Sequence, residues 1–138
     1  RWDLDLDNLE LLAHRCPNFH RALETRFITV NLGTGDVAIA VDATENTRLF
    51  WASASGALAL ADAGEISIIF PTRRNRERLG QFSIYEDVIR DARAYPAQVI
   101  APHKEDRDGE QWLMIPENLG YPVTGQPIAT AEQARPRD

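Results

Sequence analysis

The sequence predicts a single α+β domain with a mixed, largely antiparallel sheet. Short runs of β-branched, aromatic and aliphatic residues have strand length and are separated by turn residues. Capping residues mark the ends of several helical stretches. Strands and helices do not alternate regularly, which argues against a doubly wound sheet. We expect residues 1–121 to form this domain and residues 122–138, rich in proline, alanine and unpaired charge, to form a flexible tail.

Most strands are predicted in the N-terminal part of the chain. Acidic residues alternate with leucine in Arg1–Cys16, which indicates an extended start followed by either a helical turn or a strand. Further strands are expected at Thr25–Leu32, at the apolar run Val37–Val41 and at Thr47–Ala52. Between the first two of these, Gly33–Asp36 is predicted to be a turn, because glycine adopts positive φ without strain.

Two helices are expected in the middle of the chain. Ser53 is placed to cap a helix over Ala54–Ala63, and Gly64 follows where that helix should end. Pro71–Leu79 is predicted to be a second helix, which ends at the next glycine. The apolar stretch Ile66–Phe70 between them is either a short buried strand or a connector.

A third helix and a hairpin are expected after Gly80. Ser83-Ile84-Tyr85-Glu86 has the capping-box pattern, which predicts Ser83 as the N-cap of a helix to about Tyr95. Gln98–Pro102 and Gln111–Ile115 are predicted to be the two strands of a hairpin around the turn Glu105–Gly109. His103 stands alone in this stretch, and we expect it to be exposed. The aromatic residues expected in the core are Phe27, Phe50, Trp51 and Trp112.

Composition excludes several classes of function. The 138 residues are 43% hydrophobic and 26% charged, as in ordinary globular proteins. The net charge of -6 opposes binding to nucleic acid and to anionic membranes, and no apolar run approaches the roughly 20 residues of a membrane span. One cysteine allows no internal disulfide, which favours a reducing, cytoplasmic location. The chain begins with arginine and its one methionine is Met114, so we expect it to be a piece of a longer protein.

Two groups of residues have alternative interpretations. His14, Cys16 and His20 have the spacing of metal ligands, but zinc requires a fourth ligand, and ordinary loop residues are the simpler interpretation. Four arginines lie in the second predicted helix, where Arg74 and Arg78 share one face and Arg73 and Arg76 another. They form either a site for a pyrophosphate or the 3′-phosphate of coenzyme A or, as we favour, a solvated face. No aromatic residues interleave with them, as a nucleic-acid stacking platform would require.

An ordered series of short motifs resembles the coenzyme A diphosphatase-like branch of the Nudix hydrolases, in the region downstream of their Nudix box. The series covers roughly Leu4 to Ala94 and extends weakly to Pro122. It comprises an acid-and-leucine lead-in, a His-x-x-Pro turn, a strand ending Thr-Arg-Phe, a glutamate before a tryptophan, an Ala-Leu helix, and a Pro-Thr that opens an arginine-bearing helix. The matching positions are Leu4–Asp7, His14–Pro17, Arg21–Phe27, Glu45, Trp51, Ala57–Leu58 and Phe70–Leu79.

The match has departures. A tryptophan and a threonine of the family pattern are Arg15 and Cys16 here, and an arginine and an aspartate are Ala22 and Glu24. The glutamate that the family carries at the helix cap is replaced by Gly56. These differences affect expected substrate contacts more than the fold, which by resemblance is all or part of a Nudix-like α/β/α sandwich.

The glutamate-rich Nudix box itself is absent. The family pattern is Gly-x5-Glu-x7-Arg-Glu-hydrophobic-x-Glu-Glu-x-Gly, which supplies the oxygen ligands that Mg²⁺ or Mn²⁺ needs. Of all the glycines, only Gly80 has a glutamate at the required offset, Glu86, and Ala94-Tyr95 stands where Arg-Glu should follow. No two glutamates are adjacent anywhere in the chain. Either the box lies on residues that precede this chain, which we favour, or the chain is a relative that has lost catalysis.

The resemblance implies a metal-dependent phosphoanhydride hydrolase acting on nucleoside-diphosphate-linked substrates such as coenzyme A derivatives. It implies a catalytic role for Glu45, which would position or deprotonate the attacking water, and substrate phosphate contacts from Arg21, Arg26, Arg73 and Arg74. Mg²⁺ or Mn²⁺ would be bound by the full-length enzyme and not by this chain alone. A homodimer is compatible with this hypothesis. The alternatives are a binding or interaction module that has lost hydrolysis, and a small structural domain without a ligand.

Overall fold

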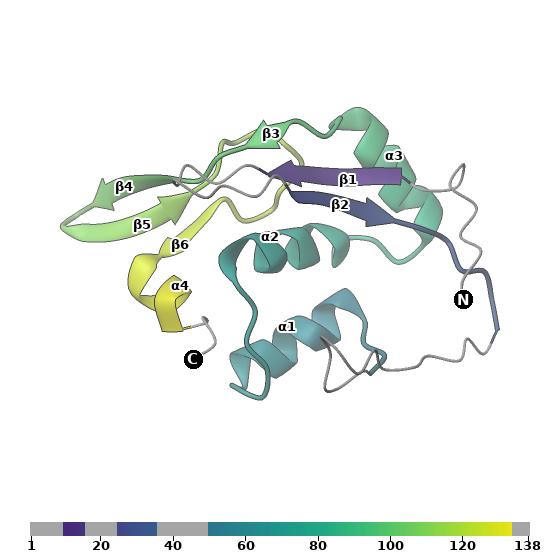
Figure 1. The fold of residues 1–138 in the computed structure, drawn as a ribbon, viewed down its shortest axis with the longest axis horizontal. Coiled ribbons are helices and arrows are strands. Elements are labelled where there is room, and N and C mark those ends of the chain that lie inside the picture. Colours follow the sequence, from purple (N-terminus) through teal and green to yellow (C-terminus); the bar gives the residue numbers. More distant parts are fainter. Residues whose placement is uncertain (1–9, 16–24, 36–49, 134–138) are drawn as a thin grey trace.

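The computed structural model describes residues 10–15, 25–35 and 50–133, which form two small sheets and four helices (Figure 1). The mixed arrangement confirms the predicted α+β class. The expected strand Val37–Val41 and most of the expected strand Thr47–Ala52 lie outside the described residues.

The first sheet has the strand order β2-β1-β3. Its strands are β1 (Glu10–Arg15), β2 (Thr25–Thr29) and β3 (Val99–Ile100). β1 pairs antiparallel with β2 and parallel with β3, so the sheet is mixed and joins segments far apart in the sequence. The end of the stretch Arg1–Cys16, which was expected to be either a helical turn or a strand, is therefore a strand. The strand expected at Thr25–Leu32 is present and ends at Thr29.

The second sheet is antiparallel, with the order β4-β5-β6. Its strands are β4 (His103–Arg107), β5 (Glu110–Met114) and β6 (Gly125–Pro127). Asp108 and Gly109, with φ of 54° and 85°, form a two-residue turn between β4 and β5. Such turns need two residues in the left-handed region, which Asp-Gly accepts readily.

The predicted hairpin is therefore present, but its first strand was placed wrongly. His103–Arg107 pairs with β5, whereas the expected first strand, Gln98–Pro102, contributes β3 to the other sheet. The reason is the tight Asp108-Gly109 turn, which allows β4 to run directly up to the turn. His103 is exposed as expected, but it lies in a strand.

Helices occupy most of the middle of the described chain. They are α1 (Ala54–Asp62), α2 (Phe70–Leu79), α3 (Tyr85–Ala94) and the short α4 (Ile128–Gln133). The predicted cap of α1 is confirmed, because the Ser53 Oγ accepts a hydrogen bond of 3.0 Å from the Gly56 N–H. The two remaining predicted helices are confirmed to within one or two residues at each end, and the stretch before α2 is a connector rather than a strand.

The predicted capping box of α3 is wrong. The N-cap residue is Ile84, one position after Ser83, and no side chain caps the helix. The first turn of α3 instead carries two acidic residues, Glu86 and Asp87, whose charge favours a helix N-terminus.

Two of the aromatic residues expected in the core are exposed. Phe50 and Trp51 are 45% and 63% exposed. They lie in the irregular segment that leads into α1, where no sheet face is present to cover them. Phe27 is half-buried, and Trp112 is half-buried with its ring 5.1 Å from the Arg107 guanidinium carbon.

The stretch expected to be a flexible tail contains structure. β6 is the third strand of the second sheet, and α4 follows it directly. Gln126 and Ala131 are both buried, at 9% exposure each. Long-range contacts hold this segment, and its proline and alanine content gave no sign of them. Residues 134–138 lie outside the described part.

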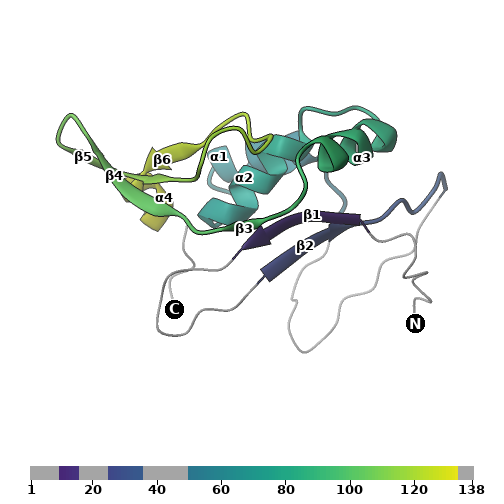
Figure 2. The same ribbon diagram turned by 90° about the horizontal axis from the view of Figure 1, so that it is seen from above.

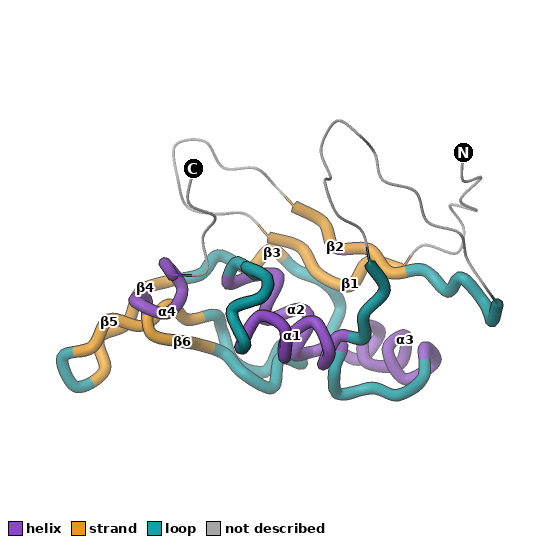
Figure 3. Tube along the Cα trace, turned by 90° about the horizontal axis from the view of Figure 1, so that it is seen from below, coloured by secondary structure: helices purple, strands orange, loops and turns teal. Residues whose placement is uncertain are grey.

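The described helices that lie against the first sheet are all on the same face of it. Figures 2 and 3 show α1, α2 and α3 on the same side of β1 and β2. The bulge between Leu11 and Ala13 lets two consecutive residues, Leu12 and Ala13, point into this helix-covered side. The largest apolar side chains of the core belong to this interface and its surroundings: Leu12, Ile68, Phe70, Val88, Met114 and Ile115.

Candidate functional site

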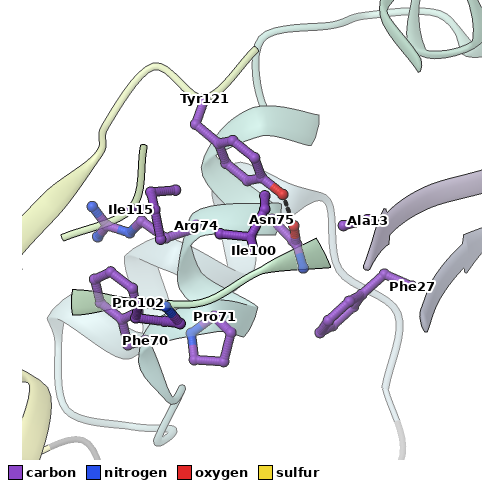
Figure 4. Close-up of a pocket in the computed structure, with 10 residues that line it drawn as sticks. All are labelled: Ala13, Phe27, Phe70, Pro71, Arg74, Asn75, Ile100, Pro102, Ile115 and Tyr121. Carbon is purple, nitrogen blue, oxygen red and sulfur yellow. Dashed lines mark hydrogen bonds between the residues drawn. The ribbon is translucent and has the colours of Figure 1, made fainter. Parts of the chain in front are cut away.

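A small cavity lies between the inner face of the first sheet and α2 (Figure 4). Its apolar lining includes Phe27, Ile100 and Ile115, and its polar lining consists of Arg74, Asn75 and Tyr121. The volume is about 20 Å³, which is room for one water-sized group. Small-molecule sites typically measure roughly 300–1,000 Å³. The cavity therefore belongs to the packing of the core and is too small for a nucleotide.

The guanidinium of Arg74 is the most highly connected polar group at this cavity. Arg74 is 3% exposed. Its Nη1 donates to the Gly125 carbonyl at 3.1 Å, and its Nη2 donates to Gln126 Oε1 at 2.9 Å and Glu77 Oε1 at 3.0 Å. It also lies 5.1 Å from the centre of the Phe70 ring, while its Nε is buried without a partner. Arg74 thus ties α2 to β6 of the second sheet.

Burial changes the pKa of both members of the Arg74–Glu77 pair. Burial raises the pKa of the Glu77 carboxyl above its ordinary value of 4.5, and the positive charges of Arg74 and Arg73 oppose this shift. Burial also lowers the pKa of Arg74, which the negative charge of Glu77 opposes. Both shifts show that the charged pair is removed from water and that attraction only partly compensates for the lost hydration.

Tyr121 acts as a hydrogen-bond donor at the cavity. Its hydroxyl donates to Asn75 Oδ1 at 2.9 Å (Figure 4). Burial raises the pKa of Tyr121 above its ordinary value of 10.0, and the charge of Arg78 opposes the shift. At neutral pH the phenol therefore keeps its proton and cannot serve as a general base.

Arg78 connects three further parts of the fold. It is 2% exposed, and its Nε contacts Asp91 Oδ2 of α3 at 2.7 Å. Its Nη1 donates to the Leu12 carbonyl of β1 at 3.1 Å, and its Nη2 donates to the Tyr95 carbonyl at 3.5 Å. Its guanidinium carbon lies 5.3 Å from the centre of the Tyr121 ring. We call Arg74 and Arg78 the internal arginines.

The structure confirms the predicted division of the four arginines into two faces of α2. The internal arginines point into the core, and Arg73 and Arg76 are half-buried on the other side. The expectation of a solvated face is wrong for the internal arginines. The reason is that β1, α3 and β6 bring acceptors to them from distant parts of the sequence.

The two α2 arginines expected to contact substrate differ in their access to solvent. Arg73 pairs with Asp62 Oδ1 at 2.6 Å and with Glu77 Oε1 at 3.3 Å, and its side chain is 26% exposed. Arg74 is enclosed, so an anion could reach it only by displacing Glu77 or β6. Arg74 is thus bonded to other parts of the protein, whereas Arg73 is partly accessible to solvent.

The other expected site residues lie elsewhere. Arg26 is exposed in β2, directly opposite His14 of β1. Arg21 and Glu45 lie outside the described residues, as do Cys16 and His20. The structure therefore does not bring Arg26 together with Arg73 and Arg74, because α2 lies on the other face of the first sheet.

The implied Mg²⁺ or Mn²⁺ does not fit the residues that are described. A hard divalent cation needs several oxygen ligands that converge on one point. In residues 10–15, 25–35 and 50–133, no group of three or more histidine, cysteine, aspartate or glutamate side chains could hold a metal. Nor is any helix within these segments a candidate to cross a membrane.

Sequence reasoning missed three polar residues of this region. Asn75 was hidden among the arginines of its helix, and Tyr121 and Gln126 lie at or beyond the start of the expected tail. Their hydrogen bonds join residues far apart in the sequence: Tyr121 bonds Asn75 across 46 positions, and Gln126 bonds Arg74 across 52 positions. No local pattern in the sequence could have indicated them.

Comparisons with models of known families, with curated proteins and with solved structures find no significant match for this chain.

Proposed function

We propose that this chain is part of a Nudix-type hydrolase that cleaves the phosphoanhydride of nucleoside-diphosphate-linked substrates such as coenzyme A derivatives. In this proposal, the metal-binding glutamate helix lies on residues outside 1–138. The motif series from Leu4 to Ala94 motivates the proposal. One structural observation supports it, namely the uncovered apolar face of the first sheet.

That face carries large aliphatic side chains at the surface. Leu11 and Ile28 are direct cross-strand partners and are 39% and 53% exposed, and Val99 of β3 is 55% exposed. Their neighbours Ala13, Phe27 and Ile100 line the cavity on the helix-covered side. Because successive side chains of a strand point to opposite faces, the exposed three lie on the face away from α2. We call this surface, Leu11, Ile28 and Val99, the outer sheet face.

A three-layer sandwich would cover the outer sheet face with another helix. Complete burial of one Leu, Ile or Val side chain stabilises a protein by roughly 1.5–3 kcal/mol, so a helix on this face would gain stability from three such groups. The Nudix helix is amphipathic, with glutamates on one side. Its apolar side would pack on the outer sheet face, and its carboxylates would bind the metal.

The contribution of this chain to the reaction is then mainly positional. When bound, the divalent metal would polarise the phosphoryl oxygens and activate water. Water adds its oxygen to one phosphorus, and the other phosphate leaves as the second product. Arg26 lies on the same side of the sheet as the outer face, because its partner His14 is also the partner of Val99. The proposal therefore assigns substrate contact to Arg26 rather than to the internal arginines; it keeps Arg21 as a further substrate contact and Glu45 as the residue that positions or deprotonates the attacking water.

The test compares this chain with the longer protein encoded by its own reading frame. Coenzyme A is incubated with each in the presence of Mg²⁺, and ³¹P NMR follows the conversion of the diphosphate signals to phosphate monoester signals. We expect turnover only by the longer protein, and only with metal. Hydrolysis by residues 1–138 alone, verified by intact mass, would contradict the proposal. So would a reading frame without a glutamate box upstream.

A second candidate is a binding or interaction module that does not hydrolyse. The internal engagement of Arg74 and Arg78 favours it, because these two cations are bonded inside the fold and do not face a pyrophosphate. The outer sheet face would then be an interface with a partner. Calorimetry with coenzyme A, with and without Mg²⁺, separates the two candidates. The module predicts the same binding under both conditions and intact coenzyme A at the end.

A further inference from the structure

An open cleft lies between α3 and the chain that follows β2, away from the cavity at α2. Its volume is about 800 Å³, within the roughly 300–1,000 Å³ range of small-molecule sites. One wall is α3 and the other is the turn after β2. The lining residues that matter here are Asn31, Gly33, Tyr85, Ile89, Arg90 and Arg93.

Two accessible arginines line this cleft in the C-terminal half of α3, each paired with one carboxylate. Arg90 and Arg93 are neighbours on the surface of α3, three positions apart, and their side chains are 77% and 74% exposed. Arg90 Nη1 contacts Asp87 Oδ1 at 2.6 Å, and Arg93 Nη2 lies 3.6 Å from Glu10 Oε1. Exposed ion pairs of this kind contribute only about 0–1 kcal/mol. A phosphate with two negative charges can therefore compete for both guanidinium groups.

The rest of the α3 wall consists of Tyr85, Ile89 and the carboxylate of Glu86. Tyr85 and Ile89 lie one helical turn apart and are both half-buried, which holds their side chains against the helix. Across the cleft, Asn31 Oδ1 accepts a hydrogen bond of 2.8 Å from the Gly33 N–H, which closes the turn that forms the facing wall. A flat ring can pack on the tyrosine and isoleucine, and such contacts with aromatic side chains are favourable.

We propose that this cleft binds a small organic phosphate that joins a flat or apolar group to a phosphate or diphosphate, as in a nucleoside diphosphate. The phosphate end lies at Arg90 and Arg93, and the flat group lies on Tyr85 and Ile89. Glu86, which follows Tyr85 in the first turn of α3 and also lines the cleft, disfavours a phosphate there, so the phosphate binds in the C-terminal half of α3. The site contains no step of bond cleavage and does not depend on the proposed hydrolase activity.

Binding is tested with ADP in the presence of EDTA and at low ionic strength, where charge attraction is least screened. Calorimetry gives the affinity, and amide shifts in ¹H–¹⁵N spectra locate the site. We expect saturable binding, with shifts at residues 31–33 and 85–93. The double variant Arg90→Ala/Arg93→Ala should bind ADP at least tenfold more weakly, and Tyr85→Leu should weaken ADP without affecting inorganic pyrophosphate.

The matched control is Arg107→Ala, which removes another exposed, ion-paired arginine on the distant hairpin. It should bind ADP as the wild type does. Circular dichroism spectra of the variants establish that each is folded. The proposal is overturned if wild-type protein shows no saturable ADP binding, if the double variant binds equally well, or if the shifts cluster elsewhere. Because metal is absent and no product is measured, these outcomes are independent of whether the longer protein hydrolyses coenzyme A.

Discussion

At the scale of single residues, the internal arginines are the most consequential side chains that the structure describes. A guanidinium group has five N–H donors in a rigid plane, and Arg78 uses three nitrogens to reach α3, β1 and the end of α3. A lysine has one nitrogen and could not span these acceptors. The position thus needs arginine for its geometry as well as for its charge.

Arg78→Ala is expected to lower the free energy of unfolding by about 3–5 kcal/mol, the usual cost of removing one partner from a buried ion pair. The variant leaves Asp91 and the Leu12 carbonyl without their donor. Urea unfolding followed by circular dichroism measures the change. Arg107→Ala is the control and should lose at most about 1 kcal/mol, because it removes only an exposed ion pair with Glu105 and a contact with the Trp112 ring. A loss below about 1 kcal/mol for Arg78→Ala would show that water replaces these bonds.

Glu77→Gln tests the pKa shift. Because the pKa of Glu77 is raised in the folded state, the stability that this group contributes is fully present below its unfolded pKa and is lost as pH rises through the folded value. The glutamine oxygen can still accept from Arg74 but does not titrate. The wild type should therefore lose stability relative to Glu77→Gln between about pH 4 and about pH 7. Urea unfolding at both pH values measures this, and an unchanged difference would refute the shift.

At the scale of elements, local sequence correctly predicted where α1 begins, and it predicted the β4–β5 hairpin but expected its turn over Glu105–Gly109 instead of Asp108-Gly109. Ser53 caps α1 through a hydrogen bond to Gly56, and Asp108-Gly109 adopts the two positive φ angles of a tight hairpin turn. Both features depend on residues within four positions of each other. For α3 the same reasoning fails, because Ser83 lies one residue before the true N-cap.

The two serines make a matched test of capping. Ser53→Ala should lower the free energy of unfolding by about 1 kcal/mol, because an orphan N–H of α1 loses its acceptor. Ser83→Ala should change it by less than about 0.5 kcal/mol, because this exposed serine caps nothing. Thermal and urea unfolding of both variants provide the comparison. Equal losses for the two would mean that the Ser53 bond contributes no stability.

At the scale of the whole molecule, the described helices cover one face of the first sheet, whereas Leu11, Ile28 and Val99 on the outer sheet face are exposed. The internal arginines bind the helical layer to both sheets, since Arg78 reaches β1 and Arg74 reaches β6. Neither arginine contacts a side chain of the outer sheet face.

Ile28→Lys should separate stability from assembly. In residues 1–138 alone, the free energy of unfolding should change by only about 0.5 kcal/mol, because Ile28 is already 53% exposed. Under the proposed function, the same substitution in a longer protein that carries the glutamate helix should prevent packing of that helix and abolish metal-dependent turnover. Ile69→Lys, at a residue 44% exposed outside the outer sheet face, is the control and should retain turnover. Full activity of Ile28→Lys would argue against an interface here.

Much of the local structure could be predicted, whereas the candidate site could not. The strand beginning at Thr25, the helices α1 and α2 and the presence of a hairpin follow from spacing, caps and turns that act over a few residues. The predicted burial of Phe50 and Trp51 was wrong, because the hydrophobicity of a side chain does not reveal whether another part of the fold covers it. For the arginines of α2, helical periodicity separated the two faces correctly but could not tell which face is buried.

The sequence by itself determined the α+β class, the capped helix after Ser53, the presence of a hairpin that ends its turn at Gly109, and the absence of a Nudix box from residues 1–138. Only the tertiary structure decided that β3 joins β1 in parallel, that Arg74 binds Gln126 across 52 positions, and that Arg90 and Arg93 border an open cleft. The physical reason is the range of the interactions. Caps and turns are satisfied within a few residues, whereas burial and long-range hydrogen bonds depend on which segments meet when the chain folds.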